Sequence, residues 1–249
     1  MPVPGPQSDA ERKGREILQA AIQALGGQAF LNARTVRAEG RAFQFGREEE
    51  LAGMARFVEY EKFPDKVRQE LGKDKEVIVV ISGDKGWDKD IHGVREYPEE
   101  EMKRIGENRL LGIEHILRYR LNEPGLTVRY VGDDIMDGRP VNLVEVADAD
   151  NRVVTIAVEK STRLPVRRRW SRRNPKTNVR EEELEVLGNY RKVGYVQTPY
   201  YTLRERDGQK LFEVFLTSAA YDIALPDFLF ERPPGPERPI PGRKKKGGK

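Results

Sequence analysis

The stretch SGDKGWDKD, residues 82–90, places one of only two tryptophans in the chain among lysines and aspartates. Gly83 and Asp84 are typical turn residues, so they predict that the chain reverses just before Trp87. The apolar run VIVVI, residues 77–81, ends directly before this turn. Because successive side chains of a strand point to opposite faces, the tryptophan can face inward while neighbouring charges stay in water. A hairpin is therefore predicted, in which Trp87 either lines a cavity or fills a closed core.

Strand-like segments continue on both sides of this hairpin, and turn signals such as Asp137-Gly138 and Asp207-Gly208 separate most of them. They lie near residues 35–45, 51–63, 66–71, 75–82, 86–97, 127–133, 139–148, 151–159, 165–171, 181–190, 197–206 and 210–219. Strands that follow one another after short turns indicate an antiparallel meander rather than alternating strands and helices. A sheet of this size is expected to curl or to close on itself.

Two regions have helical rather than strand patterns. Ser8 and Glu11 form a capping box before apolar residues at helical spacing, and Gly26-Gly27 ends that helix. Residues 98–121 begin with a proline and three glutamates, as helices often do, and glycines divide their apolar pattern into two short helices. The predicted fold class is α+β and mainly antiparallel β. About 11–12 strands form one curled sheet or half-open barrel, with an N-terminal helix and a central helical pair as a lid.

The charge of the chain is distributed unevenly. The formal net charge is +4, but residues 232–249 hold seven basic residues and one acidic residue, a net of +6. The remaining 38 basic and 40 acidic residues have a net charge of −2. Because the C-terminal end is also rich in proline and glycine, we expect a disordered basic tail over residues 232–249. We further predict a disordered N-terminus over residues 1–8 and a single domain over residues 9–231.

Several short motifs occur in order along this domain. KFPDKVR (62–68) and SGDKGW (82–87) are followed by STRLP (161–165), by NYR (189–191) and by a closing segment at 228–233. This order and spacing resembles the LolA/LolB-like lipoprotein carrier superfamily, which includes outer-membrane lipoprotein-sorting proteins. The resemblance implies a half-open β-barrel whose helical lid covers an apolar cavity. Family members use that cavity to hold lipoprotein acyl chains.

The resemblance also implies a cavity lined from the sheet and from the lid. The residues expected to line it are Met54, Phe63, Val79, Ile81, Trp87, Met102, Ile105, Ile113 and Leu117. Lipoprotein carriers tend to have a basic residue directly before the proline of the KFP motif, where it can latch the lid. Here Phe63 takes that position, and Lys62 is displaced by one residue, which turns it to the opposite face of a strand. We therefore expect a lid held by packing against Phe63 rather than by a hydrogen-bonded arginine.

The sequence offers little support for catalysis or for a bound metal. Cysteine is absent, and His92 and His115 are the only histidines, without the short spacing of zinc ligands. GDDIMDGR (132–139) lacks two of the oxygen ligands of a calcium loop, so an Asp-Gly hairpin turn explains it better. No G-x-S-x-G nucleophile motif is present. We expect no enzyme activity, no catalytic residues, no metal and no cofactor.

The run RLPVRRRWSRR, Arg163–Arg173, combines six arginines with one tryptophan. Arginines interleaved with an aromatic residue can bind nucleic acid or phosphate head groups. The next predicted strand carries Glu181, Glu182, Glu183 and Glu185, which could pair with these arginines across the sheet. Cross-strand ion pairs are the interpretation that we prefer.

These patterns, taken with the resemblance, predict a non-enzymatic envelope binding protein that holds an apolar ligand in the cavity of a half-open β-barrel. The ligand would be a lipid or a lipoprotein acyl chain. Two alternatives stay open: a ligand-free structural or interaction module of the envelope, and an anionic-surface or nucleic-acid binder that uses the basic tail and the Arg163–Arg173 run. For the leading function we expect a monomer in the periplasm or cell envelope, with its signal peptide absent from this sequence. We also expect peripheral membrane contact, an unnamed envelope protein partner and no nucleic acid.

Overall fold

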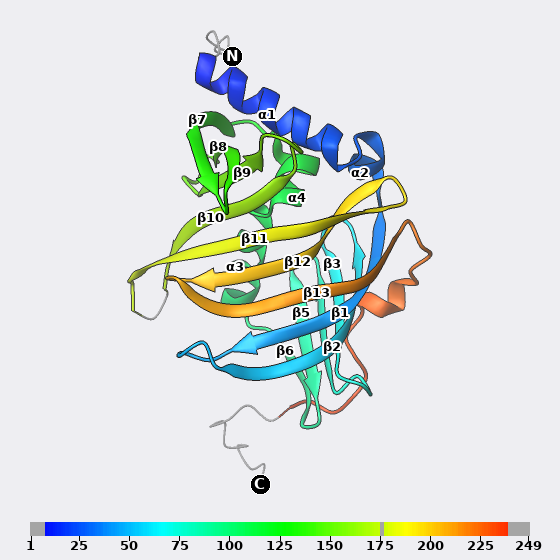
Figure 1. The fold of residues 1–249 in the computed structure, drawn as a ribbon. Coiled ribbons are helices and arrows are strands. Elements are labelled where there is room, and N and C mark those ends of the chain that lie inside the picture. Colours follow the sequence, from blue (N-terminus) through cyan, green and yellow to red (C-terminus); the bar gives the residue numbers. More distant parts are fainter. Residues whose placement is uncertain (1–7, 175–176, 239–249) are drawn as a thin grey trace.

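In the computed structural model, which describes residues 8–174 and 177–238, one thirteen-stranded antiparallel sheet curls around a set of helices (Figure 1). The helical elements are α1 (Asp9–Leu25), α2 (Gln28–Asn32), α3 (Glu99–Leu110), α4 (Ile113–His115), the π-helical turn η1 (Ile116–Arg120) and the 3-10 turn η2 (Asp227–Phe230). The strands are β1 (Thr35–Phe45), β2 (Leu51–Lys62), β3 (Lys66–Leu71), β4 (Val77–Ser82), β5 (Lys85–Asp90), β6 (Gly93–Glu96), β7 (Thr127–Met136), β8 (Arg139–Ala147), β9 (Val153–Glu159), β10 (Pro165–Arg173), β11 (Arg180–Val193), β12 (Val196–Arg206) and β13 (Gln209–Tyr221). The predicted curled, mainly antiparallel α+β fold is confirmed.

The strand order is β6-β5-β4-β3-β2-β1-β13-β12-β11-β10-β9-β8-β7, so all neighbouring strands are consecutive in sequence except β1 and β13. The chain starts at the centre of the sheet, reaches one edge at β6, and resumes at the opposite edge with β7. α3, α4 and η1 connect these two edges and lie behind the front strands in Figure 1, on the concave side of the sheet. We call residues 99–120 the lid, because this connection must cross the interior that the sheet encloses.

The number of strands differs from the expected 11–12 at one place. The segment expected at 86–97 is divided into β5 and β6, which pair with each other around a tight turn. In that turn the His92 N–H donates to Asp90 Oδ1 at 2.8 Å, and Gly93 has a φ of 119°, which glycine adopts easily. A two-residue turn leaves almost no gap in the sequence pattern, so the sequence alone suggests one strand.

The expected capping box is confirmed at the start of α1. The Glu11 N–H donates to Ser8 Oγ at 3.2 Å, and the Ser8 N–H donates to Glu11 Oε2 at 2.9 Å. α1 then packs on β7, and a Cβ added to Gly14 would lie only 2.8 Å from the Tyr130 nitrogen. This close approach lets α1 bury its apolar face, including Leu18, which has no exposed surface.

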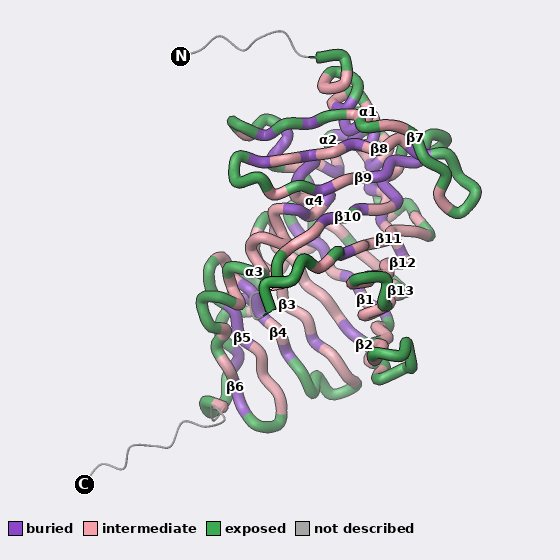
Figure 2. Tube along the Cα trace, turned by 90° about the vertical axis from the view of Figure 1, so that its left-hand side faces the viewer, coloured by how far each residue is buried: buried purple, intermediate pink, exposed green. Residues whose placement is uncertain are grey.

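The main hydrophobic core lies between the helices and the concave face of β7–β10, where Figure 2 shows many buried residues. Its buried members are Leu18, Ala21, Ile22, Leu25, Phe30, Leu111, Ile113, Ile116, Leu117, Leu121, Leu126, Val128, Val144, Val146, Val154, Ile156, Val158, Trp170 and Val196. A smaller core at the other end of the sheet contains Ile78, Val80, Trp87 and Val94. The buried residues of these two cores come from elements on either side of β1, β2 and β13, the strands at the middle of the sheet.

The expected cross-strand ion pairs of the arginine run are confirmed. β10 pairs with β11 so that Arg168 lies opposite Glu185, and their ion pair measures 2.6 Å. Arg172 contacts Glu183 at 3.0 Å, and Arg204 of β12 contacts the same carboxylate at 3.2 Å. The fully buried Glu183 is therefore compensated by arginines from both neighbouring strands, as a buried charge requires.

The C-terminal segment corrects the domain boundary expected at residue 231. The Arg238 N–H donates to the Val94 carbonyl of edge strand β6 at 2.7 Å, and the Arg238 side chain forms an ion pair with Asp88 at 2.6 Å. The proline-rich composition of this segment predicts disorder. The contact forms nevertheless, because an extended chain can lie along an edge strand with few backbone hydrogen bonds. The rest of the expected disordered ends, residues 1–7 and 239–249, lies outside the described residues.

Candidate functional site

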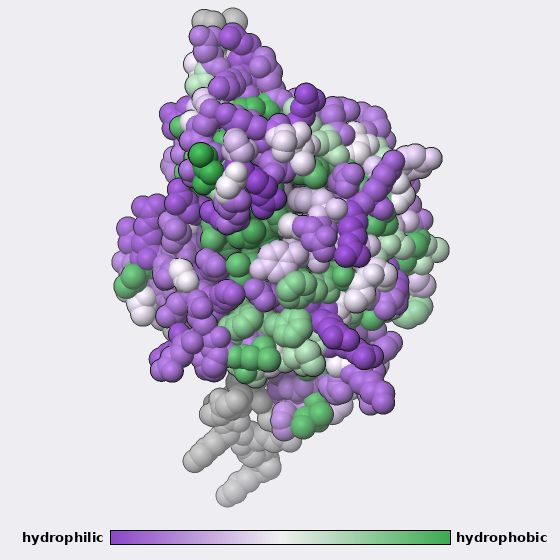
Figure 3. All heavy atoms as spheres, in the orientation of Figure 1, coloured by the Kyte–Doolittle hydropathy of each residue, from purple (hydrophilic) through white to green (hydrophobic). Residues whose placement is uncertain are grey.

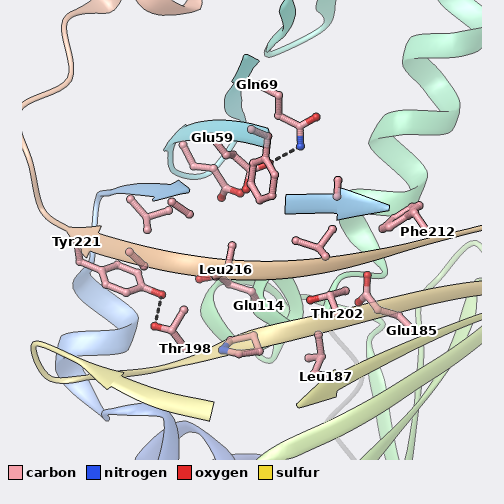
Figure 4. A pocket seen from close by; sticks show the side chains of 18 of the residues that line it. Glu59, Gln69, Glu114, Glu185, Leu187, Thr198, Thr202, Phe212, Leu216 and Tyr221 are labelled. Carbon is pink, nitrogen blue, oxygen red and sulfur yellow. Dashed lines mark hydrogen bonds between the residues drawn. The ribbon is translucent and has the colours of Figure 1, made fainter. Parts of the chain in front are cut away.

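The concave face of the middle strands holds a pocket with a volume of about 530 Å³. β1, β2 and β3 form one side, β11, β12 and β13 form the other, and Glu114 of α4 approaches from the lid (Figure 4). The lining residues are Val36, Ala38, Ala42, Phe57, Glu59, Glu61, Gln69, Leu71, Glu114, Glu185, Leu187, Thr198, Pro199, Thr202, Phe212, Val214, Leu216, Ala219 and Tyr221. Most of these side chains are aliphatic or aromatic, and several are as small as alanine.

Strand alternation and one bulge explain how the pocket forms. On β13, Val214 and Leu216 face the pocket, whereas the residues beside them point to the outer face. The β1–β13 pairing shifts its register between Glu39 and Gly40, and a Cβ on Gly40 would lie 2.3 Å from the Phe215 carbonyl oxygen. Bulges increase local bending and twist, so this close approach helps to curve the sheet around the pocket.

The structure brings none of the nine predicted cavity residues to the wall of this pocket. Two of them extend the same face beyond it: Val79 on β4 pairs with the pocket residue Gln69, and Ile81 follows two positions later. Met102 of α3 covers this part of the sheet, since a Cβ on Gly86 would approach both Met102 and Ile81 within 2.8 Å. This region lies under α3 and beside the pocket.

Five predicted residues lie elsewhere. Ile113 and Leu117 are buried in the main core, Ile105 is on α3, and Met54 is 61% exposed on the outer face of β2. Trp87 is 8% exposed and belongs to the smaller core, on the side of the sheet opposite the pocket. Met54 and Trp87 lie on strands, where a displacement of one residue turns a side chain to the other face and so away from the pocket.

Phe63, the remaining predicted residue, contacts an arginine of the lid. The Arg118 guanidinium lies 4.3 Å from the centre of the Phe63 ring and 4.4 Å from that of Phe30. Arg118 also donates to the Ala33 carbonyl at 3.0 Å and forms an ion pair with Glu114 at 2.7 Å. These contacts correct the expectation of a lid without a hydrogen-bonded arginine. The arginine comes from the lid, and the turn between β2 and β3 provides the Phe63 ring.

Four glutamates of the pocket are absent from the sequence-based set: Glu59, Glu61, Glu114 and Glu185. Sequence alternation carries a signal for two of them, because Phe57, Glu59 and Glu61 occupy every second position of β2 and therefore share one face. Acidic residues are frequent along the whole chain, so this signal does not stand out. Figure 4 shows Glu59, Glu114 and Glu185 around the same space, from three different elements.

The four carboxyl groups differ in their partners. Glu185 accepts two hydrogen bonds from Arg168, at 2.6 and 3.2 Å, and Glu114 pairs with the lid arginine described above. Glu59 accepts a hydrogen bond from the Gln69 amide. Glu61 is surrounded by protein, although part of its surface opens to the pocket. Burial, followed by the nearby charges of Glu59 and Glu114, raises the pKa of Glu61 well above its ordinary value.

Two hydroxyl groups add neutral polar atoms to the pocket. The hydroxyl oxygens of Tyr221 and Thr198 lie 3.1 Å apart and share a hydrogen bond. Burial is the largest cause that raises the pKa of Tyr221, so this phenol stays protonated near neutral pH. In Figure 4 these hydroxyls and the Glu59–Gln69 pair lie on opposite walls of the pocket.

Within residues 8–174 and 177–238, no three histidine, aspartate or glutamate side chains come together in a way that could hold a metal ion. In the same described ranges, no helix has both the length and the apolarity needed to cross a membrane. The polar chemistry of the pocket described above rests on carboxyl, amide and hydroxyl groups.

The outer face of the middle strands carries an apolar patch, which we define as Phe43, Met54, Tyr201 and Phe215. The Phe215 ring centre lies 5.8 Å from that of Phe43 and 5.0 Å from that of Tyr201, and Phe215 is exposed. Phe43 and Met54 are register partners on β1 and β2. Figure 3 shows apolar and aromatic side chains gathered at the centre of this face, within a polar surround.

Comparisons with known proteins add to this geometry. No protein-family model matches the chain, and no curated protein matches it. An outer membrane lipoprotein-sorting protein domain from Vibrio parahaemolyticus matches with a TM-score of 0.59 and 12% identity, over 88% of this chain and 97% of that one. A DUF1329 family protein from Desulfovibrio piger matches with a TM-score of 0.61 and 14% identity, over 90% and 98% of the two chains.

A LolA superfamily protein from Nitrosomonas europaea also matches, with a TM-score of 0.54 and 12% identity, over 88% of this chain and 97% of that one. These matches extend over nearly the whole of each solved chain. At such low identity they establish the fold and leave the roles of individual residues open. The chain has the fold of the LolA-like, lipoprotein-sorting proteins, as the order of its motifs suggested.

Proposed function

We propose that this protein is a non-enzymatic envelope protein that binds a lipid or a lipoprotein acyl chain in the concave pocket. The observation that carries the proposal is the pocket itself, about 530 Å³ in volume and lined mostly by apolar side chains. Sites for small molecules commonly have this size and this mostly apolar lining. Each methylene group that leaves water for such a surface contributes ~0.8 kcal/mol to binding.

The fold supports the same class of function. Two of the matched structures are described as an outer membrane lipoprotein-sorting domain and as a LolA superfamily protein. We propose from this likeness that the protein works in the periplasm or cell envelope as a monomer, without a cofactor, and passes its ligand to an envelope protein. The side chains of Val79, Ile81 and Met102, beside the pocket and under α3, would contact the rest of a long ligand.

A matched pair of alanines offers a direct test of the pocket. Ala219 lines the pocket, and the neighbouring Ala220 on the same strand is exposed on the other face. In the Ala219→Trp variant, the indole would fill the pocket and reduce binding of an environment-sensitive apolar dye by about tenfold or more. The Ala220→Trp variant should bind the dye as the unmodified protein does, with a stoichiometry near one.

Two outcomes would contradict the proposal. A folded protein that binds no dye and retains no lipid, as judged by mass spectrometry of lipids that copurify with it, would favour a ligand-free envelope module. Equal loss of binding in the Ala219→Trp and Ala220→Trp variants would show that the dye binds outside the pocket. Circular dichroism of both variants establishes that they fold.

The apolar patch on the outer face of the middle strands favours a second contact with lipid. Aromatic side chains combine a large apolar area with a polar edge and are common at membrane interfaces. Beside the patch, Arg41 and Arg56 are register partners across β1 and β2, and neither forms an ion pair within the described residues. We propose that this face makes peripheral contact with anionic membranes. Sedimentation with anionic vesicles should fall for the Phe215→Ser variant and stay unchanged for Leu216→Ser, which alters the pocket face instead.

A further inference from the structure

The charges of the pocket restrict the polar head of its ligand. The lining residues include four glutamates and no lysine, arginine or histidine. A free fatty acid would bring a carboxylate into a partly desolvated space that already contains carboxyl groups. Burying an anion without a cation beside it is costly, and like charges add to that cost. A ligand with an anionic head is therefore a poor match for these walls.

Two of the four glutamates already have cationic partners, and both partners lie outside the pocket wall. Arg168 makes two hydrogen bonds with Glu185 and lies 4.2 Å from the centre of the Trp170 ring. Arg118 is fully buried in its side chain, pairs with Glu114 and stacks on two phenylalanine rings. Neither guanidinium belongs to the pocket wall, so neither is placed to receive an anionic head group.

The other two glutamates have unused acceptor capacity. Glu59 and Glu61 lie two positions apart on β2 and so face the same side. Glu59 accepts one hydrogen bond from Gln69, and in the described residues neither glutamate forms an ion pair with a lysine, arginine or histidine. The groups around Glu61 are Glu59 on its own strand, Glu114 and Arg118 from the lid, and the Tyr221 hydroxyl on β13. Burial of Glu61, followed by the neighbouring carboxyl groups, raises its pKa and favours retention of a proton when the pocket holds no cation.

We propose that the pocket binds an amphiphile whose head group carries an amine, with the ammonium held by Glu59 and Glu61 and the alkyl chain against the apolar walls. This inference rests on the proposed function, because it assigns the head group of the ligand of the same pocket. A primary ammonium offers three N–H donors, which two carboxyl groups can accept. When the ammonium binds, the proton retained by the glutamates leaves to solvent, so binding of the cation is accompanied by release of up to one proton.

Displacement of the bound dye by three amphiphiles with the same chain tests this assignment. Dodecylamine, dodecanol and dodecanoate differ only in the head group, and each is used below the concentration at which it forms micelles. At neutral pH we expect dodecylamine to displace the dye at about tenfold lower concentration than dodecanoate, with dodecanol between them. Titration in weakly buffered solution should show proton release with dodecylamine and none with dodecanol.

Substitution of Glu59 and Glu61 tests whether these two glutamates cause the preference for the amine. Glu59→Gln and Glu61→Gln keep the size and polarity of the side chain, so we expect them to fold. Each should reduce the preference for dodecylamine over dodecanoate by at least about fivefold and leave dodecanol displacement unchanged. Glu182→Gln, on the outer face of β11, is the matched control and should preserve the preference.

The outcomes separate this inference from the proposed function. If the dye binds but dodecanoate displaces it as well as dodecylamine does, the amine assignment is wrong and the lipid-binding function stands. The same conclusion follows if both glutamine variants keep the full preference for the amine. If no amphiphile and no dye bind to the folded protein, the proposed function itself fails.

Discussion

Two regions of the same curled sheet use their concave faces differently. Over β7–β10 the concave face is filled by side chains of the protein itself, such as Leu18 of α1 and Ile116 of the lid. Over the middle strands the corresponding face carries small residues, including Ala38 and Ala219, together with carboxyl groups. One sheet therefore provides a close-packed core at one end and an open pocket at its centre.

The difference shows that the curl of the sheet does not by itself create a pocket. Where large aliphatic residues of the helices meet large aliphatic residues of the strands, the space closes to the density of an ordinary protein interior. Where the strands present alanines and glutamates, and the lid contributes Glu114, the space stays open to water. Most of the folding stability should therefore come from the packed core over β7–β10, which we call the filled region. Ligand binding should depend on the pocket over the middle strands, which we call the open region.

Matched leucine truncations should give the largest difference between the two regions. Leu18 has no exposed surface, so Leu18→Ala leaves a cavity and should reduce the free energy of unfolding by about 2–5 kcal/mol. Leu216 lines the pocket, where truncation enlarges a space that already exists, and Leu216→Ala should cost less than about 1 kcal/mol. Urea denaturation measures both. Equal losses would show that the pocket is packed as tightly as the core.

Two helical glycines sharpen the comparison at the level of the backbone. Gly14→Ala places a Cβ 2.8 Å from a backbone nitrogen of β7, so α1 must shift, and we expect a loss of about 1–3 kcal/mol. A Cβ on Gly106 of α3 would meet no atom within 4 Å. Gly106→Ala should therefore stabilise the protein by up to about 1 kcal/mol through helix propensity. If Gly14→Ala leaves the free energy of unfolding unchanged, α1 does not pack closely on the filled region.

The contact between Phe63 and Arg118 should matter locally rather than globally. Phe63→Ala removes one of two rings that flank the guanidinium, and a cation–π contact of this kind contributes about 0.5–2 kcal/mol. We expect faster amide hydrogen exchange in residues 113–120, with the β7–β10 strands unchanged. Phe43→Ala, on the outer face, is the control. Faster exchange only outside the lid would show that Phe63 does not hold it.

The smallest expected effect concerns pH and the open region. The pKa of Glu61 is raised in the folded protein, so a cost to folding grows as the pH rises from the ordinary pKa of glutamate to the raised one. This cost disappears as the pH falls below the ordinary pKa. Glu61→Gln removes the ionisation. The variant should therefore be more stable than the unmodified protein at about pH 8 and show no such advantage at about pH 3, where the carboxyl group is mostly protonated in both folded and unfolded chains. Urea denaturation at both pH values measures this, and an unchanged or reduced stability at the higher pH would contradict it.

Much of the fold follows from local signals. The capping box at Ser8 and Glu11, the Asp-Gly turns and the alternation within strands each depend on residues that are close together in the sequence. These signals therefore predict local structure without knowledge of the tertiary fold. Together they predict the meander, α1 and the helical lid, and they suffice for the resemblance to lipoprotein carriers. They also predict the ion pairs between the arginine run and β11, because hairpin neighbours lie opposite each other.

The residues of the pocket follow from contacts that the sequence does not encode locally. β1 and β13 are far apart in the chain, yet their pairing and its bulge at Gly40 determine the curl of the middle strands. Trp87 is a further example: the smaller core encloses it on the face away from the pocket. Strand alternation has a period of two, so the sequence specifies which residues share a face, whereas only the packing of distant segments decides which of the two faces lies inside.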